Sequence, residues 1–171
     1  MIKLVITIII VVLVFFVFSV FGIGSNSDRN SAGYLPGDVL YSLDKSWEWL
    51  QLNLLTISED KKIKLELKFL DERLAELQKL QEKKDLTEQK AQELMNDYNN
   101  LADKVGSDIK KAKEAKQSVD DFSAKIKELT NKQQSVIEQI SNEAPEKTSD
   151  IINKISDWGQ ESYNKLKSIL E

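Results

Sequence analysis

A single apolar seam runs through residues 91–140 and constrains the fold more than any other feature of the chain. Written as heptads, its a positions step from Ala91 to Ile140 and its d positions from Leu94 to Val136 without a change of phase. Apolar residues that repeat every 3.5 positions are typical of helices packed along one another. Beyond the first 37 residues, no segment alternates between apolar and polar residues as a strand would. The sequence therefore predicts an all-α fold.

The same seam predicts one long helix over residues 86–141. The obvious place for a break is Gly106, because glycine costs about 1 kcal/mol relative to alanine inside a helix. The heptad phase passes through Gly106 unchanged, which favours an uninterrupted helix. A hinge at Gly106 that closes a compact bundle is the alternative. Ala112 and Ala115 allow either close approach or a weak joint, and Gln133 is a lone polar a position of the kind that sets helix register.

Apolar residues at helical spacing predict three shorter helices, over about 38–57, 59–84 and 145–171. The first has a continuous apolar seam made of Leu40, Leu43, Trp47, Leu50, Leu54 and Ile57. Short connecting turns should make neighbouring helices antiparallel, with helix 59–84 on the first half of the long helix and helix 145–171 on the second. We therefore expect an elongated antiparallel helical hairpin or coiled-coil bundle with one long central helix.

The expected helix starts carry capping signals. Asp38 and Ser58 are suitable N-cap residues for the first two helices, because their side-chain oxygens can accept a backbone N–H. Asp85 precedes the long helix, and Glu88 completes a capping-box spacing. Pro145 is favoured in the first turn of the last helix.

Residues 4–23 form an apolar run without a charged side chain. Twenty residues at about 1.5 Å each give a helix of about 30 Å, the thickness of a bilayer's hydrocarbon core. A cleaved signal peptide is the alternative, but its apolar region is shorter and ends in a small-x-small site, which Phe21–Gly24 lacks. The run therefore predicts an uncleaved transmembrane helix that contacts the lipid bilayer.

The span divides the chain into a transmembrane anchor (1–23), a flexible linker rich in Gly, Ser and Asn (24–37) and a helical domain (38–171). Lys3 lies on the amino-terminal flank, and positive flanks favour the cytoplasm. We expect a single-pass cell-membrane protein with a cytoplasmic amino terminus and with residues 24–171 outside the cell.

Composition excludes most catalytic chemistry. The chain has no histidine and no cysteine, so it lacks the usual general base, thiolate nucleophiles, disulfides and the commonest transition-metal ligands. Its 24 basic and 28 acidic residues give a net charge of −4, which argues against nucleic acid. Phosphate-loop, dinucleotide-binding and nucleophile-elbow motifs are absent. We expect no enzyme, no catalytic or cofactor-binding residue, no cofactor and no small-molecule substrate.

Charged clusters are interpreted as solvated helix faces. Carboxylates gather in two clusters, Asp71/Glu72/Glu76 and Glu143/Glu146/Asp150. Lysine and arginine residues are interleaved with them, and no calcium-loop pattern occurs. We therefore predict no metal ligand. The basic run Lys110–Lys116 is interpreted in the same way.

The aromatic residues divide into core and surface candidates. Trp47 and Trp158 lie on apolar stripes and are expected in the core. Tyr41 and Trp49 share the second face of helix 38–57, where they either pack against the long helix or form a candidate partner surface. A seam that the other helices cover incompletely would also allow self-association.

Two short motifs carry a resemblance to a known family. Residues 35–41 read L-P-G-D-V-L-Y, a lysine and a glutamate follow at Lys45 and Glu48, and residues 73–77 read R-L-A-E-L. This pattern resembles a bacterial domain of unknown function, usually found just outside a membrane span and often in anti-sigma-factor-like or envelope proteins. The resemblance implies a bacterial extracytoplasmic helical domain and no activity. We interpret its motif residues as structural: Leu35, Pro36, Gly37, Asp38, Leu40, Tyr41, Arg73, Leu74 and Glu76.

Together these features predict a membrane-anchored helical interaction or structural protein of the bacterial envelope, which binds another protein or itself. The alternative is the sensory or regulatory arm of an envelope stress system of the anti-sigma kind. Such an arm would signal through the membrane helix of a partner, because only Met1–Lys3 are expected inside the cell.

Overall fold

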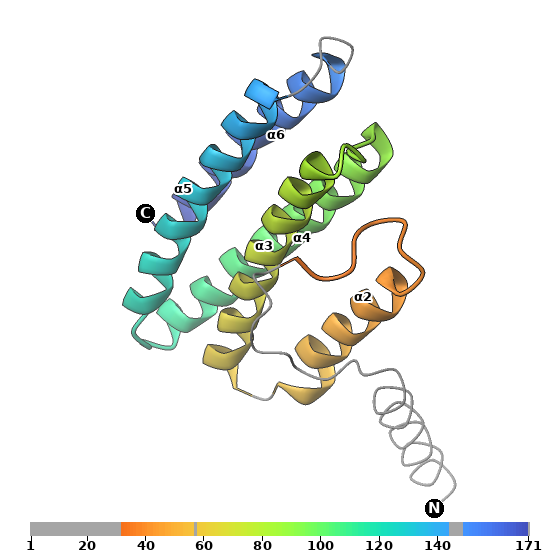
Figure 1. Ribbon diagram of the computed structural model, residues 1–171. Helices are drawn as coiled ribbons and strands as arrows, with labels where there is room; N and C mark the ends of the chain where they lie inside the picture. The colour runs from red at the N-terminus through yellow and green to blue at the C-terminus, as the bar shows by residue number, and fades with distance from the viewer. Residues whose placement is uncertain (1–31, 57, 144–148, 171) are drawn as a thin grey trace, which may run out of the picture. The chain divides into compact units, whose positions relative to one another are not determined.

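A computed structural model describes residues 32–56, 58–143 and 149–170. The chain divides into two units, Met1–Asn30 and Ser31–Glu171, and the second has a hydrophobic core of its own. Every regular element in the described part is helical, which confirms the predicted all-α fold (Figure 1): α2 (Tyr41–Leu50), the π-helical turn η1 (Gln51–Leu55), α3 (Glu59–Glu82), α4 (Glu88–Glu114), α5 (Asp120–Glu143) and α6 (Ser149–Leu170).

The predicted span at residues 4–23 and most of the predicted linker lie outside the described residues. None of the helices that the structure describes combines the length and the apolar content needed to cross a bilayer. Pro145, predicted to lie in the first turn of the last helix, also lies outside the described residues.

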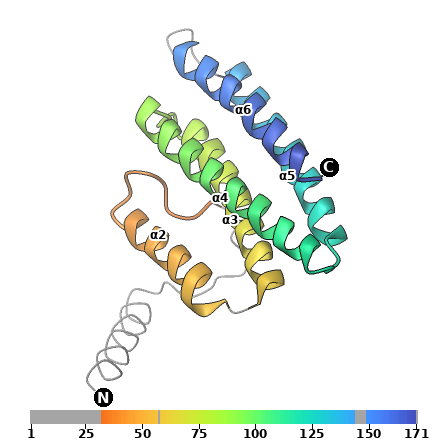
Figure 2. The same ribbon diagram turned by 180° about the vertical axis from the view of Figure 1, so that it is seen from behind.

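Helices α3 to α6 form a four-helix bundle. The hairpin α3–α4 packs on the hairpin α5–α6, so that α3 contacts both α4 and α5, and α6 contacts the same two helices (Figures 1 and 2). Each helix turns an apolar stripe inward, as a bundle requires. The fully buried side chains include Leu67, Leu70, Leu74, Leu94, Tyr98, Ile126 and Leu129.

The predicted long helix over 86–141 is wrong, because the chain reverses between Glu114 and Asp120. Lys116 takes a left-handed conformation (φ 56°), and the N–H of Gln117 donates to the carbonyl of Ala112 at 2.9 Å. This is a Schellman motif, which satisfies the last carbonyls of a helix. The seam keeps its phase because α4 and α5 both turn it toward the same core. A closed bundle therefore replaces the expected extended hairpin with one central helix.

The alternative hinge at Gly106 is also wrong. Gly106 lies inside α4, where a Cβ atom would approach the side chain of Ile169 on α6 at 3.3 Å. The missing side chain allows α4 and α6 to pack closely. The helix ends instead beside Ala112 and Ala115. These are the two small residues for which the sequence allowed either close approach or a weak joint.

The capping predictions need correction. The side chain of Asp85 does not begin α4: the N-cap is Thr87, whose hydroxyl accepts the N–H of Lys90 at 3.3 Å, and Asp85 pairs with the Lys90 ammonium at 2.6 Å. Thr87 takes this place because the chain must first turn through Lys84. Ser58 does occupy the N-cap position of α3, but its side chain makes no capping hydrogen bond with a described residue.

Gln133 connects three helices within the core. Its amide nitrogen donates to the hydroxyl of Ser162 and, at 3.3 Å, to the carbonyl of Gly159, both on α6. The Tyr98 hydroxyl on α4 donates weakly to its amide oxygen at 3.5 Å. Trp158 lies beside this layer with its ring edge-on to Tyr98, at 5.2 Å between centroids, which confirms it as a core residue. Trp47, by contrast, is half-buried on α2.

Replacing Lys116 with glycine should raise the free energy of unfolding by about 1 kcal/mol, because an L residue in the left-handed region is strained and glycine is not. Lys84 closes α3 through the same motif (φ 57°), so Lys84→Gly should act alike. Lys110→Gly, at an exposed position about one turn before the end of α4, is the matched control and should cost about 1 kcal/mol. Urea unfolding of the Ser31–Glu171 fragment, followed by circular dichroism, measures all three; equal losses would contradict the assignment.

Candidate functional site

The first sequence motif, residues 35–41, forms a closed turn. The N–H of Asp38 donates to the Leu35 carbonyl at 2.9 Å, and the Asp38 carboxylate accepts the Leu35 N–H at 2.8 Å. Pro36 suits the second position of such a turn, and Gly37 at the third has φ +96°, as a type II turn requires. Asp38 therefore closes the turn and does not cap α2, which begins after Leu40. Leu35 is buried and anchors the turn in the core.

The second motif meets the first in a buried cluster of charges. The guanidinium of Arg73 donates to Glu76 at 2.7 Å and to Glu48 on α2. Lys45 contacts Glu48 at 3.0 Å and Asp97 on α4 at 2.8 Å. The Tyr41 hydroxyl also donates to Asp97, at 3.4 Å. We call this set the motif cluster: Tyr41, Lys45, Glu48, Arg73, Glu76 and Asp97.

The cluster is short of positive charge. Three carboxylates face one guanidinium and one ammonium, and the Arg73 and Glu76 side chains are almost completely buried. Burial raises the pKa of Glu76, and the nearby Arg73 only partly offsets that rise. Burial opposes the charge on Arg73 as well, but Glu76 and Glu48 outweigh it and raise the pKa of the guanidinium. Arg73 therefore stays charged at any physiological pH.

Two atoms of the cluster have no hydrogen-bond partner among the described residues, Nε of Arg73 and Oε1 of Glu76. Burial also raises the pKa of Tyr41, which stays protonated and acts as a donor. The described residues bring together no group of three or more carboxylates that could hold a metal ion. What the arrangement does physically is hold α2 against α3 and α4 through charged groups.

Comparison with known families identifies the domain. A family model described as a domain of unknown function, DUF5667, matches residues 33–157, which include the turn and the whole motif cluster. The chain belongs to the DUF5667 family. The predicted resemblance to a domain of unknown function is confirmed at that level. Neither the curated proteins nor the solved structures compared with the chain give a match.

In this DUF5667 domain, α2 is oriented with its charged side inward. The buried residues of α2 and η1 are Tyr41, Glu48 and Leu52. The large hydrophobic side chains that are exposed in the described part of the chain all lie between residues 39 and 55, with exposed fractions from 47% to 95%. We call them the apolar face: Val39, Leu43, Trp49, Leu54 and Leu55.

The predicted apolar seam of helix 38–57 is therefore not a core seam. Leu43 and Leu54 are exposed, while Leu40, Trp47 and Leu50 are half-buried. The physical reason is the motif cluster, because the charged partners of Glu48 and Lys45 lie on α3 and α4 and turn that side of α2 toward the bundle. Ile57, the last member of the seam, lies outside the described residues.

The two residues of the candidate partner surface have different environments. Tyr41 is buried against α4, which agrees with the packing alternative and not with a partner surface. Trp49 is more than half exposed and belongs to the apolar face. Among the other motif residues, Leu74 is fully buried in the core, and Leu40 immediately precedes α2.

The acidic residues at positions 71, 72 and 76 face different partners. Asp71 pairs with Lys132 at 2.6 Å, and Glu72 pairs with Lys68 at 3.1 Å. Glu76 lies inside the motif cluster, so its interpretation as a solvated residue is wrong. Sequence spacing missed this burial because Glu76 is surrounded by side chains of the distant helix α2.

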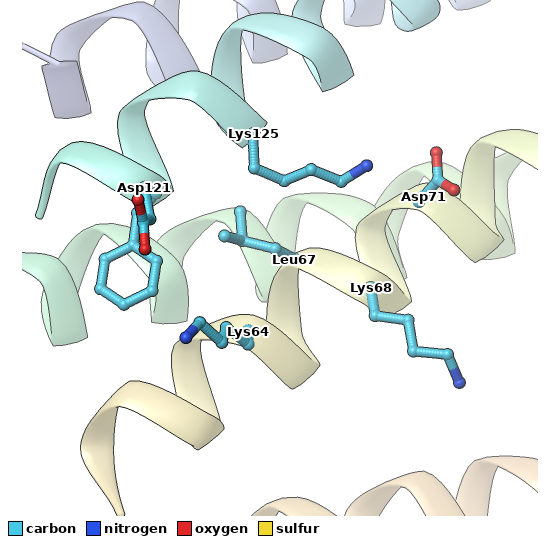
Figure 3. Close-up of a pocket in the computed structure, with 7 residues that line it drawn as sticks. Lys64, Leu67, Lys68, Asp71, Asp121 and Lys125 are labelled. Atoms are coloured by element: carbon cyan, nitrogen blue, oxygen red, sulfur yellow. The ribbon is translucent and has the colours of Figure 1, made fainter.

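A cavity of about 290 Å³ lies between α3 and α5 (Figure 3). Its floor is apolar, formed by Leu67 and Phe122, and lysines stand around its rim. Each lysine already pairs with an acidic neighbour on its own helix, at 2.7 to 3.1 Å: Lys64 with Asp60, Lys68 with Glu72 and Lys125 with Glu128. The three lysines of the cavity are therefore already paired and do not define a site for an anionic ligand.

A buried acid on α3, next to a buried carboxylate on α4, was not predicted from the sequence. Glu66 on α3 is fully buried, and neither of its carboxylate oxygens has a hydrogen-bond partner among the described residues. Asp108 on α4 is buried too, but Lys62 and Lys111 each hold it at 2.6 Å. A signal was present, because Glu66 stands at helical spacing between Ile63 and Leu70 on the core side of α3.

Proposed function

We propose that this DUF5667 protein is a membrane-anchored, extracytoplasmic helical interaction protein of the bacterial envelope, without catalytic activity. The anchor is the apolar run at residues 4–23, and the contact surface is the apolar face on α2 and η1. The observation that carries the proposal is that a buried ion pair holds α2 against the bundle while its apolar side chains face outward.

The free-energy cost of burying the charges of the motif cluster supports a role in contacts with a partner. A buried ion pair stabilises a fold little compared with apolar residues of similar size, because its charges must be removed from water. The motif cluster faces the bundle, while Leu43, Trp49 and Leu54 of the same segment stay in solvent. Contiguous exposed apolar side chains usually mark an interaction site.

Labelling in intact cells tests the anchoring. The chain has no cysteine, so a Lys127→Cys variant carries one thiol at an exposed position on α5. We expect the full chain to remain in the membrane fraction after alkaline carbonate extraction, and the thiol to react with a membrane-impermeant maleimide before lysis. A chain released by carbonate, or a thiol that reacts only after lysis, would refute the proposed location.

A further inference from the structure

We infer that the apolar face docks on the outer surface of the lipid bilayer itself, with α2 and η1 lying along the membrane interface. This inference rests on the proposed membrane anchoring and names the occupant of the contact surface. Three features of residues 39–55 carry it: their exposed chemistry, their geometry and their distance from the predicted span.

The exposed side of α2 and η1 is uncharged. Among the described residues from 39 to 55, those that are exposed are aliphatic, tryptophan, serine or asparagine: Val39, Ser42, Leu43, Ser46, Trp49, Asn53, Leu54 and Leu55. The charged residues of this stretch are half-buried or buried, namely Asp44, Lys45 and Glu48. Such a surface suits the boundary between lipid headgroups and acyl chains, where tryptophan is enriched.

The end of the helix broadens this surface. In the π-helical turn η1, the consecutive residues Leu54 and Leu55 are both exposed while Leu52 is buried in the core. Neither described cavity is lined by residues of α2 or η1. A face that combines adjacent leucines with Trp49 fits a fluid apolar medium better than a shaped partner pocket.

The position of the face along the chain favours the bilayer over a second copy. Val39 follows the predicted span, which ends at Ile23, by 16 positions. This short separation along the chain keeps the face close to the proposed anchor, so anchoring makes the docking step intramolecular. A self-association surface would be expected to carry charged positions that select its register, as helix pairs do. Those charges face inward here.

Spin labels on the full chain in phosphatidylcholine vesicles test the inference. We expect labels on Leu43→Cys and Leu54→Cys to be more accessible to oxygen, and less accessible to a water-soluble nickel complex, than a label on the control Lys127→Cys. Because the face has no exposed charge, replacing part of the lipid with anionic phosphatidylglycerol should leave this contrast unchanged. Adding Trp49→Asp should lower the docked fraction about tenfold or more, since a charge replaces an interfacial tryptophan.

The outcomes separate the inference from the proposed function. Labels at positions 43 and 54 that are as accessible to nickel as the control would overturn docking. Spin–spin broadening between copies at position 54, with that position still open to water, would also overturn it and assign the face to self-association. Flotation of the vesicles reports anchoring separately: a chain that does not float fails the proposed function, and a floating chain with water-exposed labels fails only the docking. An unchanged circular dichroism melt shows that Trp49→Asp remains folded.

Discussion

Replacing Arg73 with methionine should lower the free energy of unfolding of the Ser31–Glu171 unit by about 3–5 kcal/mol. Methionine keeps much of the apolar stem but removes the charge, which leaves Glu48 and Glu76 buried without their common cation. An uncompensated buried carboxylate is costly even when it takes up a proton. Denaturant unfolding followed by circular dichroism measures the loss.

Two controls identify the cause of that loss. Lys68→Met removes an exposed cation from the same helix, whose pairing with Glu72 lies at the surface, and it should cost less than about 1 kcal/mol. Adding Glu48→Gln and Glu76→Gln to Arg73→Met should recover a large part of the stability, because no unpaired carboxylate then remains in the cluster. A loss below about 1 kcal/mol in Arg73→Met, or no recovery in the triple variant, would contradict the importance of the motif cluster.

The domain should become less stable as the pH rises from 5 to 8, in part because of Glu66. Burial raises the pKa of Glu66 to about 7, and the charge of Asp108 adds to the rise. The unfolded chain releases this proton near pH 4.5, so between these values the folded state holds more protons and its stability falls with pH. The expected loss of free energy of unfolding that Glu66 causes is roughly 3 kcal/mol. The raised pKa of Glu76 acts in the same direction.

A neutral isostere should remove the part of this pH dependence that Glu66 causes. Glu66→Gln should be the more stable protein at pH 8 and should lose less stability between pH 5 and pH 8, while the exposed Glu82→Gln on the same helix should follow the native profile. Unfolding in denaturant at pH 5 and pH 8 gives the comparison. Parallel profiles for the native protein and Glu66→Gln, or a native stability that rises with pH, would show that Glu66 is not buried as a neutral acid.

Most of the bundle was predictable because its core residues repeat with a helical period. Helix 59–84 agrees with α3 to within two residues at its end, and seam residues such as Leu101 and Phe122 are buried. The reversal at Lys116 was not predictable from that period. No glycine or proline marks it, and a short turn between α4 and α5 leaves the heptad count in phase.

Several residues of the motif cluster could be predicted from the sequence, but the way in which they pair could not. The two sequence motifs pointed to Tyr41, Arg73 and Glu76, but the pairing of Arg73 with Glu48 crosses 25 positions and depends on how α2 lies on α3. Apolar spacing in helix 38–57 showed that the helix has an apolar side. Spacing alone does not show whether that side faces the core or the solvent. Ion pairs with α3 and α4 decided that orientation.

The distance between α2 and α4 tests the central claim, that the motif cluster is needed to hold α2 in its orientation. Spin labels on Ser46→Cys and Asn100→Cys, both exposed, report this distance by pulsed electron resonance in the Ser31–Glu171 fragment. We expect one narrow distribution of label distances in the native background and a broad one after Arg73→Met. The distance distribution of a control label pair within the bundle, Lys79→Cys and Lys127→Cys, should stay narrow in both backgrounds. An unchanged, narrow α2–α4 distribution in Arg73→Met would contradict it.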